Sequence, residues 1–455
     1  MLNDYLASLK GRRVTVIGIG ISNRPLLRLL AGAGARVEAR DKKDRSALGA
    51  ICGELEALGV SLVLGPDYLR DIEADVVFRT PGLRPDNEAL TAAARKGAVI
   101  TSEMEVFFEN CPCDLIAVTG SDGKTTTTTL ISEMLRESGR TVWLGGNIGT
   151  PLLDKCGQMR AQDIAVLELS SFQLMSMRRS PRIAVITNLS PNHLDVHRDM
   201  AEYVDAKCNI FRWQNADGLV VLNADNEVTR SLAAQAAGRV RFFSRRGDPQ
   251  ALLTVQDGAL SDGGVPILPV SEIRLPGVHN VENFLAACAA VRELVPHEVM
   301  AHVARTFAGV EHRMELCREL GGVKYYNDSI GSSPTRTIAG LRCFSQRLIL
   351  IAGGYDKHLP FDELGRECLT HVRLLILCGA TADKIEAAVR AAPGYDGSNP
   401  EIVRCGSLEE VVALAHRRAA PGDIVFFSPA CASFDQFPNF EVRGRRFKEL
   451  VNHLK

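Results

Sequence analysis

The amino-acid sequence predicts an α/β fold with parallel sheets, divided into three domains. From Arg12 onward, short β-rich runs alternate with turns and helical stretches, and such alternation is typical of parallel sheets flanked by helices. A chain of 455 residues is also too long for one hydrophobic core, and typical domain sizes give about three domains.

The expected strands follow one another in three groups. The first domain, residues 1–110, contains RVTVIG, ARVEARD, DVVFRT and GAVIT. The second, residues 111–311, opens with DLIAVTG just after Pro112 and continues with DIAVLEL and RIAVITN. The third, residues 312–455, opens with the strand pair MELCREL and GVKYYNDS and continues with RLILIAGG, RLLILCG, EIVRC and DIVFFSP. Helical stretches after these later strands predict another α/β layer.

The composition is that of an ordinary globular protein, with 46% hydrophobic and 24% charged residues. Lys plus Arg (53) nearly balances Asp plus Glu (54), so no overall field would hold the chain to nucleic acid or to an anionic membrane. The segment MLNDYLASLKGRR lacks the features of a signal peptide, and no apolar run reaches the roughly 18 residues of a membrane span. We expect a cytoplasmic protein without membrane insertion.

The 12 cysteines are scattered singly, apart from Cys111 and Cys113. Most lie inside apolar runs, where a reduced thiol packs as a small hydrophobic group. Paired zinc-type spacing is absent from the sequence. Cys111-Pro112-Cys113 is therefore interpreted as a structural segment and not as a redox or metal site.

The strongest motif is DLIAVTGSDGKTTTTTLISEML, in which an apolar strand, a glycine-rich loop and a helix follow in order. This order is typical of a phosphate-binding loop, because glycines let backbone N–H groups surround phosphate oxygens and the helix N-terminus adds its positive dipole end. Lys124 would neutralise the terminal phosphates, and the Thr125 hydroxyl would bind Mg²⁺. The loop predicts ATP or GTP binding through Gly120, Ser121, Asp122, Gly123, Lys124, Thr125 and Thr126.

Two further polar residues follow the next predicted strands. Glu168 ends the apolar run DIAVLEL, where a carboxylate beside the phosphate loop can bind Mg²⁺. His193 lies just past RIAVITN, where an imidazole suits a second metal or a polarised oxygen. Lys207 falls on a predicted helix, and by itself such a lysine is usually a solvated charge.

The N-terminal run GIGIS is similar to a dinucleotide fingerprint, but Asn23 replaces its third glycine. Alone, it would indicate a nicotinamide oxidoreductase, which leaves the Gly-Lys-Thr loop, Glu168 and Lys207 unexplained.

Over nearly its whole length the sequence resembles the Mur ligase family. TGSDGKTTT is similar to the family's ATP loop, and ELSSFQL and NLSPNHLDVH to its next two strand ends. PGVHNVENFLAA resembles the adenine-side helix, and GVEHRMEL with YYNDS resembles the hinge before the third domain. SPACASFDQFPNFEVRG is similar to the signature of the branch that adds D-glutamate.

The resemblance implies a Rossmann-like N-terminal domain for the UDP substrate, a central P-loop ATPase-like domain, and a C-terminal Rossmann-like domain for the amino acid. The implied reaction is ATP-dependent ligation of D-glutamate to UDP-N-acetylmuramoyl-L-alanine through an acyl phosphate, in peptidoglycan precursor synthesis. We expect a monomer that uses ATP and two Mg²⁺ ions and is part of the machinery of cell-wall formation, cell shape and cell division.

The resemblance also assigns residues to each ligand. The metal ligands would be Thr125, Glu168, His193 and a carbamylated Lys207, and catalysis would depend on Lys124, Glu168, His193 and Lys207. The nucleotide would also contact Asn280, Asn283, Arg313 and Asp328, and the UDP substrate Ser22, Asp41, Lys42, Asn147 and Ser170. D-Glutamate would contact Lys357, Ser433 and Phe440.

One departure and several alternatives accompany these expectations. Ile330-Gly331 stands where many family members carry Lys-Ala, which bears on the contacts of that loop. A sibling Mur ligase that adds another amino acid and a folylpolyglutamate synthase-like ligase are the alternative enzymes. An ATP-binding regulator on an inactive ligase scaffold would not need Lys124, Glu168, His193 and Lys207 together.

Overall fold

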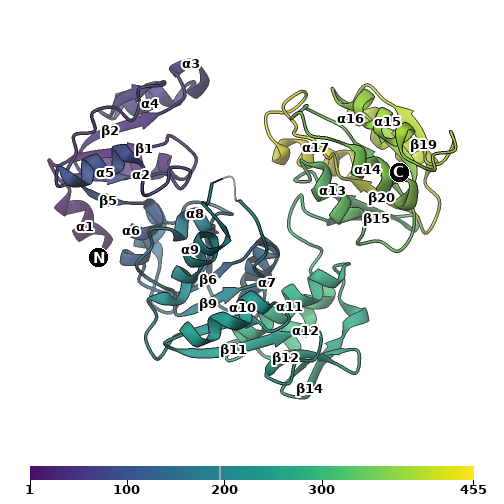
Figure 1. Ribbon diagram of the computed structural model, residues 1–455, viewed down its shortest axis with the longest axis horizontal. Coiled ribbons are helices and arrows are strands. Elements are labelled where there is room, and N and C mark those ends of the chain that lie inside the picture. The colour runs from purple at the N-terminus through teal and green to yellow at the C-terminus, as the bar shows by residue number, and fades with distance from the viewer. Residues whose placement is uncertain (194–195) are drawn as a thin grey trace. The chain divides into compact units, whose positions relative to one another are not determined.

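The computed structural model describes residues 1–193 and 196–455, so Leu194 and Asp195 of the NLSPNHLDVH segment lie outside the described residues. The chain forms two compact units. Unit 1 comprises Met1–Glu272 and Val281–Val303, and unit 2 comprises Ile273–Asn280 and Ala304–Lys455. Their sheets confirm the predicted α/β class with parallel strands (Figure 1). The boundaries of the three predicted domains stay a prediction.

The first sheet of unit 1 is parallel, with strand order β3-β2-β1-β4-β5. This order reverses direction at β1, so the loop after β1 lies where ligands bind in doubly wound folds. The strands are β1 (Arg13–Ile17), β2 (Arg36–Asp41), β3 (Ser61–Leu64), β4 (Val76–Phe78) and β5 (Val99–Thr101). The helices are α1 (Leu2–Ser8), α2 (Asn23–Gly32), α3 (Arg45–Leu48), α4 (Ile51–Ala57), α5 (Glu88–Arg95) and α6 (Glu103–Asn110).

The second sheet has nine strands in the order β14-β13-β12-β11-β10-β9-β6-β8-β7. Its strands are β6 (Asp114–Thr119), β7 (Val142–Gly146), β8 (Ile164–Glu168), β9 (Ile183–Ile186), β10 (Leu219–Asn223), β11 (Arg239–Ser244), β12 (Ala251–Gln256), β13 (Ala259–Asp262) and β14 (Val265–Pro269). Because β6 is paired with both β8 and β9, its carboxyl end adjoins the ends of the two strands that carry the predicted polar residues.

The edge formed by β12, β13 and β14 is antiparallel, a feature that the sequence analysis did not identify. The helices of this part are α7 (Lys124–Glu137), α8 (Ser171–Leu174), α9 (Met200–Arg212), α10 (Glu227–Ser231), α11 (Val278–Val291) and α12 (His297–Thr306), with 3-10 turns η1 (Leu153–Gln158), η2 (Leu232–Gln235) and η3 (Val270–Glu272).

The sheet of unit 2 has the order β15-β16-β20-β17-β18-β19, and only the pairing of β15 with β16 is antiparallel within it. Its strands are β15 (Glu315–Leu320), β16 (Val323–Asn327), β17 (Leu348–Ala352), β18 (Val372–Leu377), β19 (Glu401–Arg404) and β20 (Ile424–Phe427). Its helices are α13 (Pro334–Leu341), α14 (Asp362–His371), α15 (Ala382–Ala391), α16 (Leu408–Arg418) and α17 (Phe440–Asn452).

Several strands of the larger sheets are buried along their whole length, as expected when helices cover both faces of a parallel sheet. Every residue of β8, β10 and β17 is buried. The polar groups that follow such strands are therefore presented at the sheet edge by a rigid, close-packed support.

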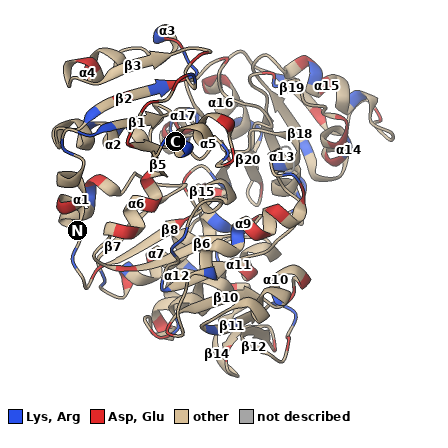
Figure 2. Cartoon of the chain, turned by 60° about the vertical axis from the view of Figure 1, so that its left-hand side comes forward, with Lys and Arg blue, Asp and Glu red and all other residues tan. Residues whose placement is uncertain are grey.

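Basic and acidic residues are interspersed along the elements of both units, in keeping with the formal net charge of −1 (Figure 2). In residues 1–193 and 196–455, no helix combines the length and apolar character needed to cross a bilayer.

Candidate active site

The loop between β6 and α7 adopts a backbone that its glycines make possible. Gly120 has φ of 148° and Gly123 has φ of 77°, both in the region that side chains disfavour. A Cβ atom at Gly120 would lie 2.0 Å from Thr187 Oγ1, and one at Gly123 would lie 2.2 Å from Asn283 Oδ1. Larger residues at either position would therefore displace the loop from its supports.

The side chains of this loop brace its turn. Lys124 Nζ folds back and donates to the carbonyl oxygens of Gly120 (3.0 Å) and Ser121 (2.8 Å). Ser121 Oγ donates to the Ser190 carbonyl (2.9 Å), and the Asp122 amide donates to Asn188 Oδ1 (3.0 Å). The segment after β9 thus holds the loop through Asn188 and Ser190, and the Lys124 ammonium group lies against the loop carbonyls.

Glu168, at the end of β8, is buried beside the loop. Thr125 Oγ1 donates to Glu168 Oε2 (2.6 Å), and Asn147 Nδ2 donates to Glu168 Oε1 (2.7 Å). A Cβ atom at Gly146 would lie 2.2 Å from the Glu168 carbonyl oxygen, so the close approach of β7 to β8 requires glycine there. The structure thus places three predicted site residues, Thr125, Asn147 and Glu168, in direct contact.

Lys207 lies on α9 and is only 1% exposed. Its Nζ donates to the Gly120 carbonyl (2.8 Å) and to Thr119 Oγ1 (3.1 Å), and lies 4.9 Å from the centre of the Tyr203 ring. Burial, followed by the positive charge of Lys124, holds the pKa of Lys207 well below its usual value. A buried amine of this kind is neutral more often than a surface lysine and is a better nucleophile.

Aromatic rings surround the segment that carries His193. The exposed His193 has φ of 54°, and its ring packs edge-on against Phe172 at 5.1 Å between centroids. The buried His197 ring stacks on the same Phe172 ring, with 5.5 Å between centroids. The Nε2 atom of His197 lies 2.9 Å from Ser171 Oγ. Tyr203 joins this cluster to the phosphate loop, because its hydroxyl lies 3.0 Å from Ser121 Oγ. The i, i+4 spacing of Tyr203 and Lys207 on α9 predicts the contact between the Lys207 amine and the Tyr203 ring, and this signal was missed in the sequence.

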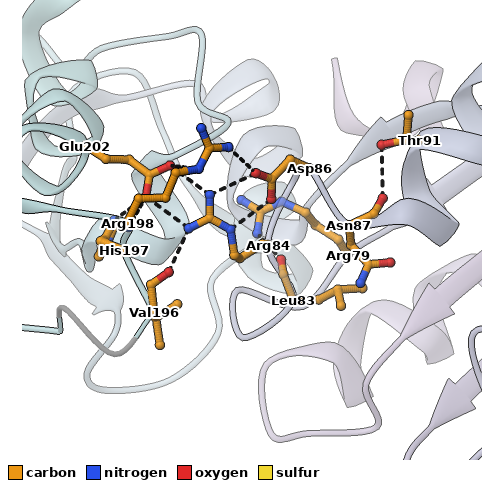
Figure 3. A network of polar contacts seen from close by, with 10 residues as sticks. All are labelled: Arg79, Leu83, Arg84, Asp86, Asn87, Thr91, Val196, His197, Arg198 and Glu202. Atoms are coloured by element: carbon orange, nitrogen blue, oxygen red, sulfur yellow. Dashed lines mark hydrogen bonds and ion pairs between the residues drawn. The ribbon is translucent and has the colours of Figure 1, made fainter.

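Two arginines and two acids link the loop after β4 to the start of α9, the helix that carries Lys207 (Figure 3). The Arg84 guanidinium donates to both Asp86 and Glu202, and also to the Val196 carbonyl (2.7 Å). Arg198 donates to Asp86 Oδ2 (2.6 Å). Hydrogen bonds from Arg84 lower the pKa of Glu202 to about 2, so its carboxylate stays charged at neutral pH. The sequence analysis did not identify this network.

The glycine-rich loop after β1 is held by the side chains of Asp41 and Asn23, whereas the loop after β6 is held by a lysine. Asp41 Oδ2 accepts from the Ile19 amide (2.7 Å), and Asn23 Nδ2 donates to the carbonyls of Ile17 (3.1 Å) and Gly18 (2.9 Å). Asn23, which interrupts the fingerprint, is therefore a clamp for the loop. Ser22 is the N-cap of α2, and Ser22 and Lys42 are both exposed beside the buried Asp41.

Ser170 and the two predicted adenine-side asparagines make local contacts. Ser170 is the N-cap of α8 and forms a capping box with Gln173. Asn283 lies against the phosphate loop, with its Oδ1 3.4 Å from Thr127 Oγ1. Asn280 Nδ2 donates to the Pro276 carbonyl (2.5 Å). Asn283 therefore contacts the helix that follows the phosphate loop.

In unit 2, Asp328 is buried just after β16. Its carboxylate accepts from Ser428 Oγ (2.7 Å) and from the Met314 amide (3.2 Å). Burial raises its pKa to about 6, and the charge of Arg313 acts in the opposite direction. Arg313 is therefore close enough for its charge to act on Asp328, and the shared nucleotide contact of the two residues stays a prediction.

The C-terminal signature is organised around Arg443, which the sequence analysis did not select although it lies within the motif. Its guanidinium is buried and donates to the carbonyls of Cys431, Ala432 and Ser329, each at 2.8–3.0 Å. Burial lowers the pKa of Arg443 to about 10. Phe440 is half-buried, and its carbonyl accepts from Ser329 Oγ (2.8 Å).

Two other residues predicted to contact the amino acid also belong to unit 2. Ser433 is buried, and its carbonyl accepts from the amides of Gln436 (3.1 Å) and Phe437 (2.8 Å). Lys357 is exposed, and its Nζ donates to the Ser332 carbonyl (3.3 Å). Ser332 follows Ile330-Gly331, so Lys357 reaches the loop in which the expected family lysine is missing.

Two models of known protein families match the chain, one mostly within unit 1 and one within unit 2. A Mur ligase middle-domain model matches residues 118–291, and a Mur ligase glutamate ligase-domain model matches residues 312–431. The chain is 52% identical to a UDP-N-acetylmuramoylalanine–D-glutamate ligase of Acetivibrio thermocellus, over 100% of this chain and 99% of the relative. The chain belongs to the Mur ligase family. This confirms the resemblance drawn from the motifs.

Further relatives of this Mur ligase agree. A UDP-N-acetylmuramoylalanine–D-glutamate ligase of Clostridium novyi is 51% identical over 99% of both chains. Among solved structures, the UDP-N-acetylmuramate-alanine ligase MurC of Thermotoga maritima has a TM-score of 0.60 at 19% identity, over 98% of this chain and 100% of that one. MurF of Acinetobacter baumannii has a TM-score of 0.57 at 15% identity, over 97% and 91%. At such identities the two structures support the fold alone.

Proposed function

We propose that this Mur ligase joins D-glutamate to UDP-N-acetylmuramoyl-L-alanine with the hydrolysis of ATP to ADP and phosphate, in peptidoglycan precursor synthesis. The observation that carries the proposal is the meeting of Lys124, the Thr125–Glu168 pair and the buried Lys207 at one phosphate loop. The full-length relatives near 50% identity are D-glutamate ligases, which supports the choice of D-glutamate as the added amino acid.

The reaction has two steps. An oxygen of the L-alanyl carboxylate attacks the γ-phosphorus of ATP, and ADP leaves, so that an acyl phosphate forms. The amine nitrogen of D-glutamate then attacks the acyl carbon, phosphate leaves, and the nitrogen loses a proton to give the amide. Both steps build negative charge on phosphate oxygens, and a preorganised cation stabilises such charge without reorganisation. Lys124, held by two loop carbonyls, has that role in our proposal.

The residues at the loop fit magnesium ions, because hydroxyl, carboxylate and carbamate oxygens are the hard ligands that Mg²⁺ prefers. Thr125 and Glu168 would hold the first ion, and His193, Glu168 and the carbamate of Lys207 the second. Bound Mg²⁺ would neutralise phosphate charge. Asn147 orients the Glu168 carboxylate by donating to Oε1, the oxygen that Thr125 does not contact. Among the described residues, no three His, Cys, Asp or Glu side chains are grouped so that they could hold a metal ion. The carbamate of Lys207 would supply the second ion with a further oxygen ligand in our proposal.

Carbamylation of Lys207 is chemically favoured by its surroundings. The neutral amine attacks CO₂ and releases a proton, and burial and the Lys124 charge increase the fraction of Lys207 that is neutral. The experiment is ¹³C NMR of the protein equilibrated with ¹³CO₂. A carbamate carbon signal that is absent from Lys207→Ala is expected, whereas the same signal in both proteins would contradict this assignment.

The remaining ligands are distributed over the chain in our proposal. Adenine, ribose and phosphates contact Asn280, Asn283, Arg313 and Asp328; the UDP substrate contacts Ser22, Asp41, Lys42, Asn147 and Ser170; and D-glutamate contacts Lys357, Ser433 and Phe440. A cation with hydroxyl donors suits the two carboxylates of glutamate. We place the enzyme in the cytoplasm as a monomer.

The test is the amino-acid dependence of phosphate release from ATP. Release should require both UDP-N-acetylmuramoyl-L-alanine and D-glutamate, and the matched variant Lys124→Ala should abolish it. Release with a diamino acid, or with L-alanine and an unsubstituted muramoyl nucleotide, would assign the chain to a sibling ligase. Release with a folate and glutamate would indicate the folylpolyglutamate synthase-like alternative.

A further inference from the structure

The sequence Cys111-Pro112-Cys113 joins α6 to β6 and places two thiols side by side. The Sγ atoms of Cys111 and Cys113 lie 3.4 Å apart, and Cys111 Sγ lies 3.8 Å from the Met159 sulfur. The amide of Cys111 is fixed by a hydrogen bond to the Phe107 carbonyl (2.8 Å), and Pro112 restricts the backbone between the thiols. Packing thus holds the two sulfur atoms together before any reaction.

The two thiols differ in their surroundings. Cys111 is half-buried, whereas Cys113 is only 8% exposed. The hydrogen bond between them lowers the pKa of Cys111 and raises the pKa of Cys113, and burial adds to the second effect. A partly exposed cysteine of lowered pKa in contact with a buried one is the arrangement of an attacking and a resolving cysteine.

We propose that Cys111 and Cys113 form a reversible redox modification site, which small peroxides convert to an intramolecular disulfide and dithiols reduce. This differs from the structural interpretation suggested by the sequence, because spacing alone did not show that the two sulfur atoms converge. The site is separate from the residues assigned to ATP, metal and substrates.

The chemistry balances with hydrogen peroxide as the oxidant. The Cys111 thiol releases its proton, the thiolate attacks one peroxide oxygen, and the O–O bond breaks, so that a sulfenic acid and hydroxide form. The hydroxide takes up the released proton and becomes the first water. The Cys113 sulfur then attacks the sulfenic sulfur, the S–O bond breaks, and the leaving hydroxide takes up the Cys113 proton as water. In sum, two thiols lose two hydrogens, one peroxide is reduced, and two waters form.

The experiment treats the full-length protein with hydrogen peroxide, alkylates the remaining thiols and maps the cysteine peptides by mass spectrometry. The peptide with Cys111 and Cys113 should lose two hydrogens and escape alkylation, and dithiothreitol should restore both alkylation sites. Unchanged alkylation of both cysteines, or oxidation of Cys111 to a sulfinic acid with Cys113 still free, would overturn the proposal.

Two variants make the test specific. Cys111→Ser, at a half-buried position that tolerates a small polar group, should lose the linked peptide entirely. Cys343→Ser removes another partly exposed thiol, which donates to the Ala339 carbonyl, and should leave the linkage intact. Equal protection of the Cys113 peptide in Cys111→Ser would contradict the assignment. Binding of phenylarsine oxide, which requires two close thiols, gives a second readout that should follow the same pattern.

Discussion

The two glycine-rich loops of unit 1 follow the first strands of two sheets, yet opposite charges surround them. After β1, the Asp41 carboxylate accepts from the Ile19 amide. After β6, the Nζ atoms of Lys124 and Lys207 both donate to the Gly120 carbonyl. The charged group paired with the first loop is thus a carboxylate, whereas the one paired with the second is the Lys124 ammonium group, which attracts phosphate. Glycine spacing therefore selects a backbone shape, and the neighbouring charges select the ligand.

The contrast also bears on the alternative of a nicotinamide oxidoreductase. In such a fold the loop amides and the helix N-terminus contact a pyrophosphate. Here the Ile19 amide is already paired with a carboxylate, and Asn23 occupies the position of the third glycine. The first loop therefore departs from the dinucleotide fingerprint at these two positions.

Removal of Lys207 should have the largest effect, because it deletes the group that most distinguishes the second loop. Lys207→Ala would lose several kcal/mol of charge stabilisation, so kcat should fall roughly 10³-fold. Short carboxylates such as acetate or formate should restore part of the activity by occupying the space of the carbamate. Steady-state phosphate release measures both effects, with the exposed Lys96→Ala as the control. Full activity of Lys207→Ala would remove the proposed distinction between the loops.

A methyl group added to each loop tests whether their backbones are equally constrained. In Gly120→Ala the new Cβ would lie 2.0 Å from Thr187 Oγ1 at an unfavourable φ, so the loop must shift. A shift of about 1 Å can cost roughly 10²-fold in rate. Gly20→Ala meets nothing within 4 Å and should leave the unfolding free energy nearly unchanged. Phosphate release and thermal unfolding of both variants measure these effects. Similar losses of activity and stability in both variants would show that the two loop backbones are equally constrained.

The first loop can be tested at its carboxylate. Asp41→Ala leaves the amides of Ile19 and Lys43 without their acceptor, which should cost about 1–3 kcal/mol of stability. If the loop serves the UDP substrate, the KM for that substrate should rise while the KM for ATP stays constant. Urea unfolding and substrate titrations measure the two effects. An equal rise in both KM values would indicate general damage instead of a local role.

Asn23→Ala should give the smallest change. It removes the two hydrogen bonds to the carbonyls of Ile17 and Gly18, which predicts a loss of about 1–2 kcal/mol in unfolding free energy. The exposed Asn3→Ala is the matched control. Stability equal to that of the parent would show that the loop does not depend on the Asn23 clamp.

Much of the fold was predictable because local patterns carry it. All the strands named from apolar runs are present, since a β-rich run between turn residues has little alternative in a layered α/β protein. The antiparallel β12–β14 edge was missed, because its strands are polar in part and defined by pairing with one another. The Arg84–Glu202 contact was missed for a related reason, since its partners are 118 residues apart.

The site divides in the same way. The sequence by itself determined the phosphate loop, the family and the residue types available for catalysis, because these are encoded in short contiguous motifs. Only the tertiary structure decided that Lys207 is buried, that Thr125 and Asn147 converge on Glu168, and that Cys111 and Cys113 share a contact. Burial, pKa and hydrogen bonding depend on atoms brought together from distant segments, and no local spacing specifies which segments those are.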